Sequence, residues 1–451
     1  MTVEASFDAL VGPTHSFAGL SPGNLAALGS RGEVSYPRRA ALQGLAKMRL
    51  VRGLGVLQGL LPPQERPHLP TLRRLGFWGS DAKVIADVAR TSPHLLAQTS
   101  SSSSMWAANA ATVAPSADTS DGRVHIVVAN LATLFHRSLE AEGTFDALAR
   151  IFSDSRRFAV HRALPSHVSL GDEGAANHMR LAPSHGAPGL HVMVFGRSAE
   201  DAKAHADMPM RQAREASEAV ARHFHLGRGR ALFVKQSRSA IERGAFHNDV
   251  VATSNQGVLL YHEAAYEAED AARLLDVGHA DVGESFTPIC VKESELPLDE
   301  AVRTYLFNGQ ILSLPGGEMA LIAPAECEES AGARATIERI LADESNPIAK
   351  VEYVDLRQSM KNGGGPACVR LRVALTEEER AAVHPACFFD EAIDAKLTTW
   401  IERRYRERLA PEDLADPKLL DESRTALDEL TQILGLGALY EFQQEPGNNG
   451  D

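Results

Sequence analysis

The sequence has few cysteines, and none of them is spaced like a metal ligand. Its 451 residues include four, Cys290, Cys327, Cys368 and Cys387, with no CxxC pair among them. Such isolated thiols fit a reducing compartment, so we expect a cytoplasmic protein. The glycine run Gly363–Gly365 is not a phosphate-binding loop, because the Lys-Ser/Thr pair that follows in a P-loop is missing.

The chain also lacks long apolar runs and an excess of positive charge. No stretch of about 18 apolar residues occurs, so we expect no membrane partner. Residues Met1–Phe7 contain no basic region followed by an apolar run, so no signal peptide is expected. The net charge is -13 and the pI is near 5.7, which argues against a nucleic-acid partner.

Nothing in the sequence divides the chain into domains. It has no Pro/Gly-rich linker and no visible repeat, and 44% of its residues are hydrophobic, which is ample for a packed core. We therefore expect one domain over residues 1–451, with a polar, frayed tail at Gly447–Asp451.

Short apolar segments alternate with helical patterns along the chain, which predicts an α/β protein. The predicted strands are Val124–Val128, Leu190–Phe195, Ala231–Val234, Val250–Thr253, Gly257–Tyr261, Met319–Ile322 and Val351–Leu356. The predicted helices are Tyr36–Gly53, Arg214–His223, Glu267–Leu275, Asp390–Leu409 and Pro417–Leu434. The serine run Ser100–Ser104 is interpreted as a flexible loop.

One cysteine lies in an unusual local sequence, Asn362-Gly-Gly-Gly-Pro-Ala-Cys368. Three glycines give a backbone that can adopt positive φ and can let a ligand come close. The apolar residues of Val369–Leu375 then alternate with other residues, as in a half-buried strand. A thiol at the mouth of a strand suits a nucleophile. The alternative is a buried apolar cysteine behind a turn.

Two further clusters contain groups that could move protons or bind a cation. The segment Phe246–Val251 is predicted to be a strand, in which His247 and Asp249 would project to one face. The second cluster, Gly171–His178, places Asp172 and Glu173 among small residues. Each cluster taken alone also fits a turn with solvated acids. Together, Cys368, His247, Asp249 and Glu173 suit attack on the central carbon of a guanidinium.

With these residues in view, the chain resembles the N-succinylarginine dihydrolase family of the pentein superfamily of guanidine-modifying enzymes. The resemblance runs from Phe7–Gly12 to the last helix. Besides the His247 segment and the Cys368 loop, the motifs that carry it are Ala18–Asn24, Met105–Thr112, Phe135–Glu140, Gly171–Gly174 and Arg211–Glu215. Two positions depart from the family pattern: Phe17 stands where a tyrosine is expected and Pro22 where a bulkier side chain is expected.

The resemblance implies a fold, a reaction and a set of site residues. The fold would be a pentein-type α/β propeller of pseudo-fivefold ββαβ units, and the protein would be a homodimer without cofactor or metal. The small-molecule substrate would be N-succinylarginine, converted by Cys368 with Glu173 and His247 to succinylornithine, two ammonia and carbon dioxide in arginine catabolism by the succinyltransferase pathway. The implied substrate contacts are Ala18, Gly19, Leu20, Ser21, Pro22, Gly23, Asn24, Leu25, Ala26, Ala27, Asn109, His136, Arg137, Arg211, Asp249 and Asn362.

The residues themselves leave alternatives open. A deiminase or an amidinotransferase acting on an arginine derivative would use the same groups. A metal-dependent ureohydrolase would use His247, Asp249, Glu173, His136 and His178 as ligands, but would give Cys368 no role. A binder of arginine-like ligands would need no thiol. Arg137 and Arg211 suit carboxylate binding, and each alternatively forms a surface ion pair.

Overall fold

The computed structural model describes residues 1–199 and 211–444. The tail predicted at Gly447–Asp451 therefore lies outside the described residues. Within them, no helix combines the length and the apolar character that a membrane crossing requires.

The strands of the described residues form five three-stranded sheets, and all five follow one plan. In each sheet the central strand pairs antiparallel with one neighbour and parallel with the other. The last four sheets are β3 (Ala111–Ala114), β4 (Val124–Val128) and β5 (Phe158–His161); β6 (His178–Leu181), β7 (Leu190–Phe195) and β8 (Ala231–Lys235); β9 (Ala252–Asn255), β10 (Val258–His262) and β11 (Thr287–Val291); and β12 (Gln310–Ser313), β13 (Met319–Pro324) and β14 (Ile348–Val354).

The remaining sheet joins the two ends of the chain. Its central strand β1 (Val3–Ala9) pairs in parallel with β2 (Leu57–Leu61). Its antiparallel neighbour is the last strand, β15 (Arg370–Leu375), with Val3 opposite Leu375 and Asp8 opposite Arg370. The beginning and the end of the fold are thus held together by one hydrogen-bonded ladder.

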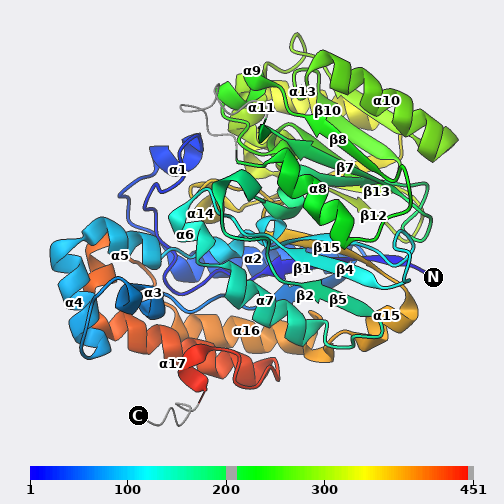
Figure 1. Ribbon diagram of the computed structural model, residues 1–451. Coiled ribbons are helices and arrows are strands. Elements are labelled where there is room, and N and C mark those ends of the chain that lie inside the picture. The colour runs from blue at the N-terminus through cyan, green and yellow to red at the C-terminus, as the bar shows by residue number, and fades with distance from the viewer. Residues whose placement is uncertain (200–210, 445–451) are drawn as a thin grey trace.

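A helix follows the central strand of every sheet, because a parallel pair requires a crossover connection. These helices are α2 (Pro37–Gly53), α7 (Ala141–Ile151), α8 (Arg214–His223), α10 (Ala268–Val282) and, after the short α12 (Ala325–Glu329), α13 (Ala331–Ala342). Figure 1 shows α10 at the periphery and the strands toward the middle of the molecule. The α/β class predicted from the sequence is confirmed.

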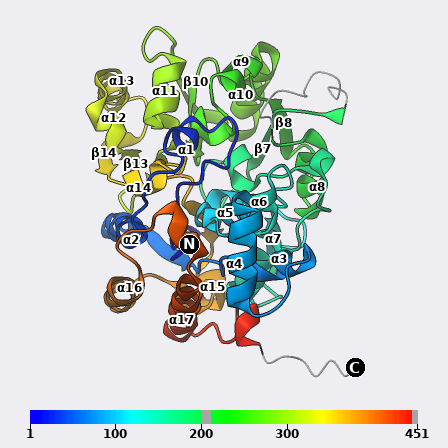
Figure 2. The ribbon, with the colours of Figure 1, turned by 90° about the vertical axis from the view of Figure 1, so that its left-hand side faces the viewer.

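The C-terminal helices α16 (Glu391–Arg404) and α17 (Pro417–Ile433) extend along the lower edge in Figure 1. In the view of Figure 2 they lie below α3 (Leu69–Arg74), α4 (Asp81–Thr91) and α5 (Pro93–Thr99). Trp400 of α16, Leu427 of α17 and Phe7 of β1 belong to one buried apolar cluster, so these helices cover the sheet that joins the chain ends.

Several predicted elements are confirmed with the same bounds, including β4, β7 and α8. The strand predicted at Phe246–Val251 is wrong. Residues Asn248–Val250 form a 3₁₀ turn, and β9 starts only at Ala252, two residues after the predicted start of Val250–Thr253. The reason is that the Asn248 amide donates to the side chain of Asn177, and the Val251 amide closes the turn on the Asn248 carbonyl, so neither joins a ladder.

The flexible loop predicted at Ser100–Ser104 is also wrong. Ser100 to Ser103 are buried, and Ser103–Met105 forms a 3₁₀ turn. Polar partners hold part of this serine run inside the protein, since the Ser103 hydroxyl donates to Glu140 and the Ser101 carbonyl accepts from Arg66.

Candidate active site

The Cys368 thiol lies two residues before β15 and is buried, with 4% of the residue exposed. Its sulfur accepts a hydrogen bond from Asn308 Nδ2 at 3.1 Å and donates one to Asp249 Oδ2 at 3.4 Å. The loop places the thiol at the mouth of a strand, as the sequence predicts. Its polar partners set it apart from an ordinary apolar cysteine.

The three glycines before Cys368 are required mainly by close approach. Gly363 has a φ of 98°, the positive region that favours glycine, and a Cβ there would lie 2.0 Å from Asn24 Nδ2. A Cβ on Gly364 would lie 2.6 Å from the Trp106 ring, and one on Gly365 would lie 2.9 Å from Asn308 Oδ1. Neighbouring side chains therefore hold this loop tightly.

Asn308 is a site residue that sequence reasoning missed. Its Oδ1 accepts the backbone amides of Gly365 at 3.0 Å and of Cys368 at 3.3 Å, while its Nδ2 donates to the sulfur. One buried side-chain amide thus positions the Cys368 loop and contacts the thiol. A lone asparagine at the end of a 3₁₀ turn, Leu306–Asn308, carries no sequence signal for this role.

His247 and Glu173 form a buried pair beside the thiol's partners. His247 Nε2 donates to Glu173 Oε2 at 2.8 Å, and Thr133 donates its hydroxyl to the other carboxylate oxygen at 2.8 Å. Burial alone would raise the pKa of Glu173, but the His247 hydrogen bond and the charges of His247, Arg211 and Arg137 lower it to about 2. The opposite ring nitrogen, His247 Nδ1, is buried without a hydrogen-bond partner among the described residues. It is therefore free to exchange a proton with a ligand.

Asp249 shares the site with His247, although not through strand alternation as predicted. The 3₁₀ turn that begins after His247 directs Asp249 to the sulfur, and the Tyr266 hydroxyl and the Asn177 side chain hold Asn248 between them. Asp249 Oδ1 is buried and has no hydrogen-bond partner among the described residues. An unpaired carboxylate oxygen beside a thiol is suited to a cationic ligand.

The electrostatics around Cys368 favour the protonated thiol. Burial, followed by the negative charge of Asp249, raises the pKa of Cys368 well above its usual range. Burial likewise raises the pKa of Asp249, with His247 and the Cys368 thiol acting in the opposite direction. The sulfur therefore needs an additional positive charge close by before it ionises near neutral pH.

The loop 18–27 reaches the site through two hydrogen bonds. Asn24, which caps α1 (Leu25–Gly29), donates its side-chain amide to the Gly363 carbonyl at 2.8 Å. Arg211 donates to the Pro22 carbonyl at 3.0 Å, and its guanidinium carbon lies 4.8 Å from the centroid of the Phe246 ring. In both ribbon views α1 lies on the same side of the molecule as α6 (Phe135–Ser138) and α14 (Arg357–Met360) (Figures 1 and 2).

Of the other predicted contact residues, Arg137 and His136 are buried polar side chains, whereas Asn109 contacts the protein backbone. Arg137 is 3% exposed and forms an ion pair with Glu140 at 2.8 Å, so it is a buried pair and not a surface one. Burial, followed by the charges of Arg137 and Arg211, lowers the pKa of His136 well below its usual range, so this imidazole is neutral. Asn109 instead donates to the backbone carbonyl of Glu173 at 2.7 Å and so holds the segment that contains Glu173.

A small cavity of about 20 Å³ connects the loop 18–27 with α6 and the Cys368 loop. Its lining includes Ala18, Gly19, Leu20, Ser21, Ala27, His136, Arg137 and Asn362. The structure thus brings these predicted contacts together. Of the remaining loop residues, Pro22 and Leu25 are exposed. The volume holds about one water molecule, which is too little for an arginine derivative.

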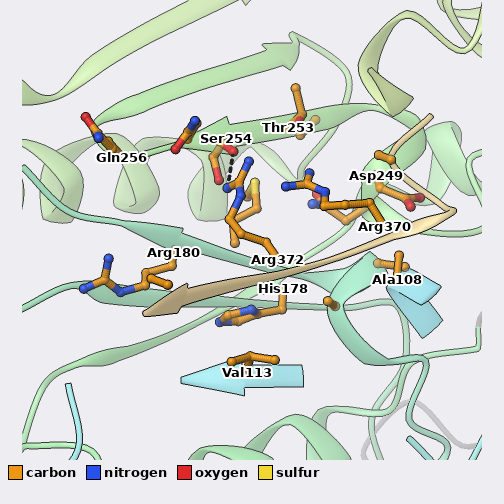
Figure 3. Close-up of a pocket in the computed structure, with 18 of the residues that line it drawn as sticks. Ala108, Val113, His178, Arg180, Asp249, Thr253, Ser254, Gln256, Arg370 and Arg372 are labelled. Carbon is orange, nitrogen blue, oxygen red and sulfur yellow. Dashed lines mark hydrogen bonds between the residues drawn. The ribbon is translucent and has the colours of Figure 1, made fainter. Parts of the chain in front are cut away.

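A second cavity, of about 110 Å³, has Asp249 in its wall but not Cys368. Figure 3 shows Arg370 and Arg372 projecting from β15 into this cavity. His178 lies on the opposite side of β15. Arg370 and Arg372 donate to Glu4 at 3.3 and 3.0 Å. His178 thus lies with this cavity and is hydrogen-bonded to His191 at 2.9 Å, away from His247. The ligand set considered for a metal-dependent ureohydrolase is therefore not assembled around one point.

Comparison with known proteins shows which family the sequence matches. Residues 1–443 match the family model described as succinylarginine dihydrolase. The N-succinylarginine dihydrolase of Nitrosospira multiformis is 56% identical over 444 residues, covering 98% of this chain and 99% of the relative. The enzyme of the same name from Myxococcus xanthus is 52% identical over 443 residues, with 98% and 100% covered.

Solved structures show a similar fold at low sequence identity. An arginine dihydrolase of the cyanobacterial ornithine–ammonia cycle matches with a TM-score of 0.52 and 16% identity, over 86% of this chain and 42% of that one. The isolated N-terminal domain of such an enzyme matches with a TM-score of 0.50 and 16% identity, over 82% and 97%. The likeness shows that this chain shares the α/β fold of these two structures.

Proposed function

The chain belongs to the succinylarginine dihydrolase family, and from this premise we propose that the Cys368 pocket is its active site. The reaction consumes N2-succinyl-L-arginine and two waters and yields N2-succinyl-L-ornithine, two ammonia and carbon dioxide. The observation that carries the assignment is the meeting of one thiol, one carboxylate–imidazole pair and one unpaired carboxylate in a buried site.

The guanidinium of the substrate binds between Asp249 and Glu173. Two carboxylates fix its plane and hold its central carbon beside the sulfur. The unpaired Oδ1 of Asp249 is the acceptor available for one of its N–H groups. The bound cation also offsets the negative charge of Asp249, which, after burial, is the second cause that raises the pKa of Cys368. Substrate binding thus favours the thiolate that the reaction needs.

The first half-reaction removes one ammonia. His247 Nδ1 takes the thiol proton, and the Cys368 sulfur forms a bond to the guanidinium carbon. His247 then gives the proton to the departing nitrogen, the carbon–nitrogen bond breaks, and a thiouronium adduct remains. Water, deprotonated by His247, adds to this carbon and displaces the sulfur. The product of this cycle is a ureido compound, succinylcitrulline.

The second half-reaction repeats these steps on the ureido carbon. The thiolate displaces the terminal nitrogen as a second ammonia and leaves a thiocarbamate on Cys368. Water releases a carbamate, which loses carbon dioxide to give the amine of succinylornithine. Throughout, the Glu173 carboxylate holds His247 in one orientation and stabilises its protonated form.

The succinyl end of the substrate lies toward the loop 18–27. Its carboxylates bind the guanidinium groups of Arg211 and Arg137, with the neutral His136 and the Asn362 amide as further polar groups. A cavity of about 20 Å³ admits no such ligand. The loop therefore opens for entry by releasing the contacts of Asn24 with Gly363 and of Pro22 with Arg211.

On the larger scale, we propose a pseudo-fivefold propeller of ββαβ units that forms one domain over residues 1–451. Support comes from the common plan of the five sheets and from the pairing of β1 with β15. Under this proposal, unfolding by urea gives one transition in both circular dichroism and tryptophan fluorescence, and separate transitions contradict it.

We also propose that the protein is a cytoplasmic homodimer. All four cysteines are free thiols, which agrees with a reducing compartment. Light scattering on a sizing column should give about twice the chain mass of 48.6 kDa. A mass equal to that of one chain contradicts the dimer.

The activity itself is tested by mass spectrometry of succinylarginine incubated with the protein. Succinylornithine accumulates, with two ammonia for each substrate consumed, and the Cys368→Ser protein forms neither product. If succinylcitrulline accumulates as the end product with one ammonia, the protein is a deiminase and the dihydrolase assignment fails.

A further inference from the structure

A cluster of histidines lies between the second and third sheets and shares no residue with the Cys368 site. Asp121 and His125 come from the turn before β4 and from β4 itself, and His225 follows α8. One ligand atom from each of these three residues lies within 4.8 Å of the other two. His161, the last residue of β5, and His223, near the end of α8, pack around them.

Hydrogen-bond contacts on both ring nitrogens orient the central imidazole. His125 Nδ1 lies 2.7 Å from the carbonyl oxygen of His223 and 3.0 Å from His161 Nε2. The carbonyl oxygen can only accept, so Nδ1 carries the proton and His161 Nε2 acts as a second acceptor. His125 Nε2 lies 3.0 and 3.1 Å from the two oxygens of the Asp121 carboxylate, which also only accept. Its lone pair would face two negatively polarised oxygens. A cation must therefore lie between them, either a second proton or a metal ion.

The spacing suits a metal ion. Ligand atoms of a tetrahedral zinc site lie about 3.3 Å apart, since each is about 2.0 Å from the metal. His125 Nε2 and Asp121 Oδ1 are 3.0 Å apart, and His225 Nδ1 is 3.9 Å from Asp121 Oδ2. A proton on Nδ1 that is donated to a backbone carbonyl is also the usual way in which an imidazole is oriented for a metal on Nε2.

Further imidazoles surround the three proposed ligands. The ring centroids of His125 and His161 lie 5.0 Å apart, and those of His125 and His225 lie 5.1 Å apart. Imidazole is the commonest metal ligand in proteins. Arg123 donates three hydrogen bonds to Asp121, from its backbone amide to Oδ1 and from its guanidinium to Oδ2. A carboxylate has about four lone-pair sites, so one on Oδ1, the oxygen 3.0 Å from His125 Nε2, is left for a metal.

We propose that Asp121, His125 and His225 bind a divalent transition-metal ion of the zinc class. The side chains of Asp121 and His225 are 29% and 52% exposed, so the site is open to an ion from solution. The ion joins the turn before β4 to the segment after α8. Backbone contacts already link the two, through the bridge of Thr119 with Leu226 and the bond from the Ser120 amide to the His225 carbonyl. The metal's role is to clip these two units together.

Calorimetric titration of the full, tag-free chain with zinc chloride tests the site. The Cys368→Ser protein is the parent, because a thiol beside His247 would offer zinc a competing site. One zinc ion should bind per chain, and His225→Ala should weaken binding at least about tenfold. His94→Ala, which removes an exposed histidine elsewhere, should bind zinc as the parent does.

Two further readouts separate a metal site from a proton alone. Cobalt should give the visible absorption bands of a four-coordinate ion in the parent and lose them in His225→Ala. Zinc at a hundredfold excess over its dissociation constant should raise the melting temperature of the parent by about 2–3 °C and leave that of His225→Ala unchanged. Equal zinc affinity in the parent and His225→Ala, or no binding to either, overturns the proposal and leaves His125 with a second proton.

Discussion

Asn308 donates a hydrogen bond to the sulfur of Cys368 across 3.1 Å, and its oxygen accepts the Cys368 amide from the same loop. The two residues are 60 positions apart in the chain. A donor on the sulfur stabilises the thiolate more than the thiol, because hydrogen bonds to charged groups are the stronger ones. Asn308 is therefore positioned to stabilise the thiolate that we propose as the nucleophile.

Replacing Asn308 separates its two roles. Asn308→Asp keeps an acceptor for the two loop amides and loses the donor, while Asn308→Ala loses both. A hydrogen bond to a charged group is worth about 1.5–3 kcal/mol, and the new carboxylate disfavours the thiolate further, so kcat should fall at least about 10-fold in Asn308→Asp. Asn308→Ala should also lower the melting temperature. Unchanged kcat in Asn308→Asp, measured by ammonia release, would show that the amide only shapes the loop.

The thiol itself should respond to pH in a characteristic way. Burial and Asp249 raise the pKa of Cys368, and alkylation requires the thiolate, so labelling of the free protein by iodoacetamide should still be increasing well above neutral pH. The half-buried Cys290 is the internal comparison, followed by peptide mass spectrometry. A labelling rate at Cys368 that is already constant at neutral pH would contradict a protonated resting thiol.

The paired carboxylate gives a prediction about stability. Glu173 has a pKa of about 2 in the folded protein against a usual value of 4.5. Because folding lowers this pKa, the ionised form stabilises the fold above about pH 4.5, and the contribution disappears as pH falls toward 2. Glu173→Gln should thus reduce the free energy of unfolding most near neutral pH, and the deficit should shrink below pH 4.5.

Urea titrations at several pH values measure this difference. Glu402→Gln, at an exposed position on α16, is the matched control and should show a small effect without the same pH trend. A deficit for Glu173→Gln that stays constant with pH would mean that shape, and not charge, is what the site needs from Glu173.

The sequence predicts much of this arrangement because part of the signal is local. The alternation in β15 and the apolar runs of β4 and β7 are readable without knowing their neighbours. The Cys368 loop is also recognisable, since three glycines in a row are rarely tolerated elsewhere. The common plan of the five sheets has no such signal, because strand order and direction depend on pairing between distant segments.

The wrong predictions and the missed residues arise for the same reason, because contacts between distant parts of the chain determine the local structure there. His247 and Asp249 lie in a segment whose backbone is held by Asn177, 71 residues before Asn248, so strand propensity alone misleads. Thr133 and Asn308 reach Glu173 and Cys368 only through the tertiary fold. The serine run at 100–104 is predicted to be flexible because its composition is polar. In the structure, however, the Ser103 hydroxyl donates to Glu140 and the Ser101 carbonyl accepts from Arg66.

Arg211 should determine the preference for the succinylated substrate. It is 4% exposed, contacts the loop 18–27 at Pro22 and lies over Phe246. Arg211→Ala should raise KM for succinylarginine about 10-fold or more, because a charge-assisted contact to a carboxylate is lost. Free arginine, which lacks the succinyl group, should remain a poor substrate of both proteins. Equal kcat/KM for arginine and succinylarginine in the unmodified protein would contradict this assignment.

Replacing Asp249 tests directly whether its charge pairs with the guanidinium of the substrate. Asp249→Asn keeps the shape and removes the charge, so no cavity is created and the fold should survive. The variant should lose more kcat/KM on succinylarginine than on succinylcitrulline, because the ureido group is neutral and needs no counter-charge. Supplying each compound separately and measuring ammonia release compares the two half-reactions. The Asn amide also replaces one carboxylate oxygen by a donor, and any resulting change at the Cys368 thiol affects both substrates alike. The difference between the two losses therefore isolates the pairing with the cation, and an equal loss on both would assign Asp249 to the thiol alone.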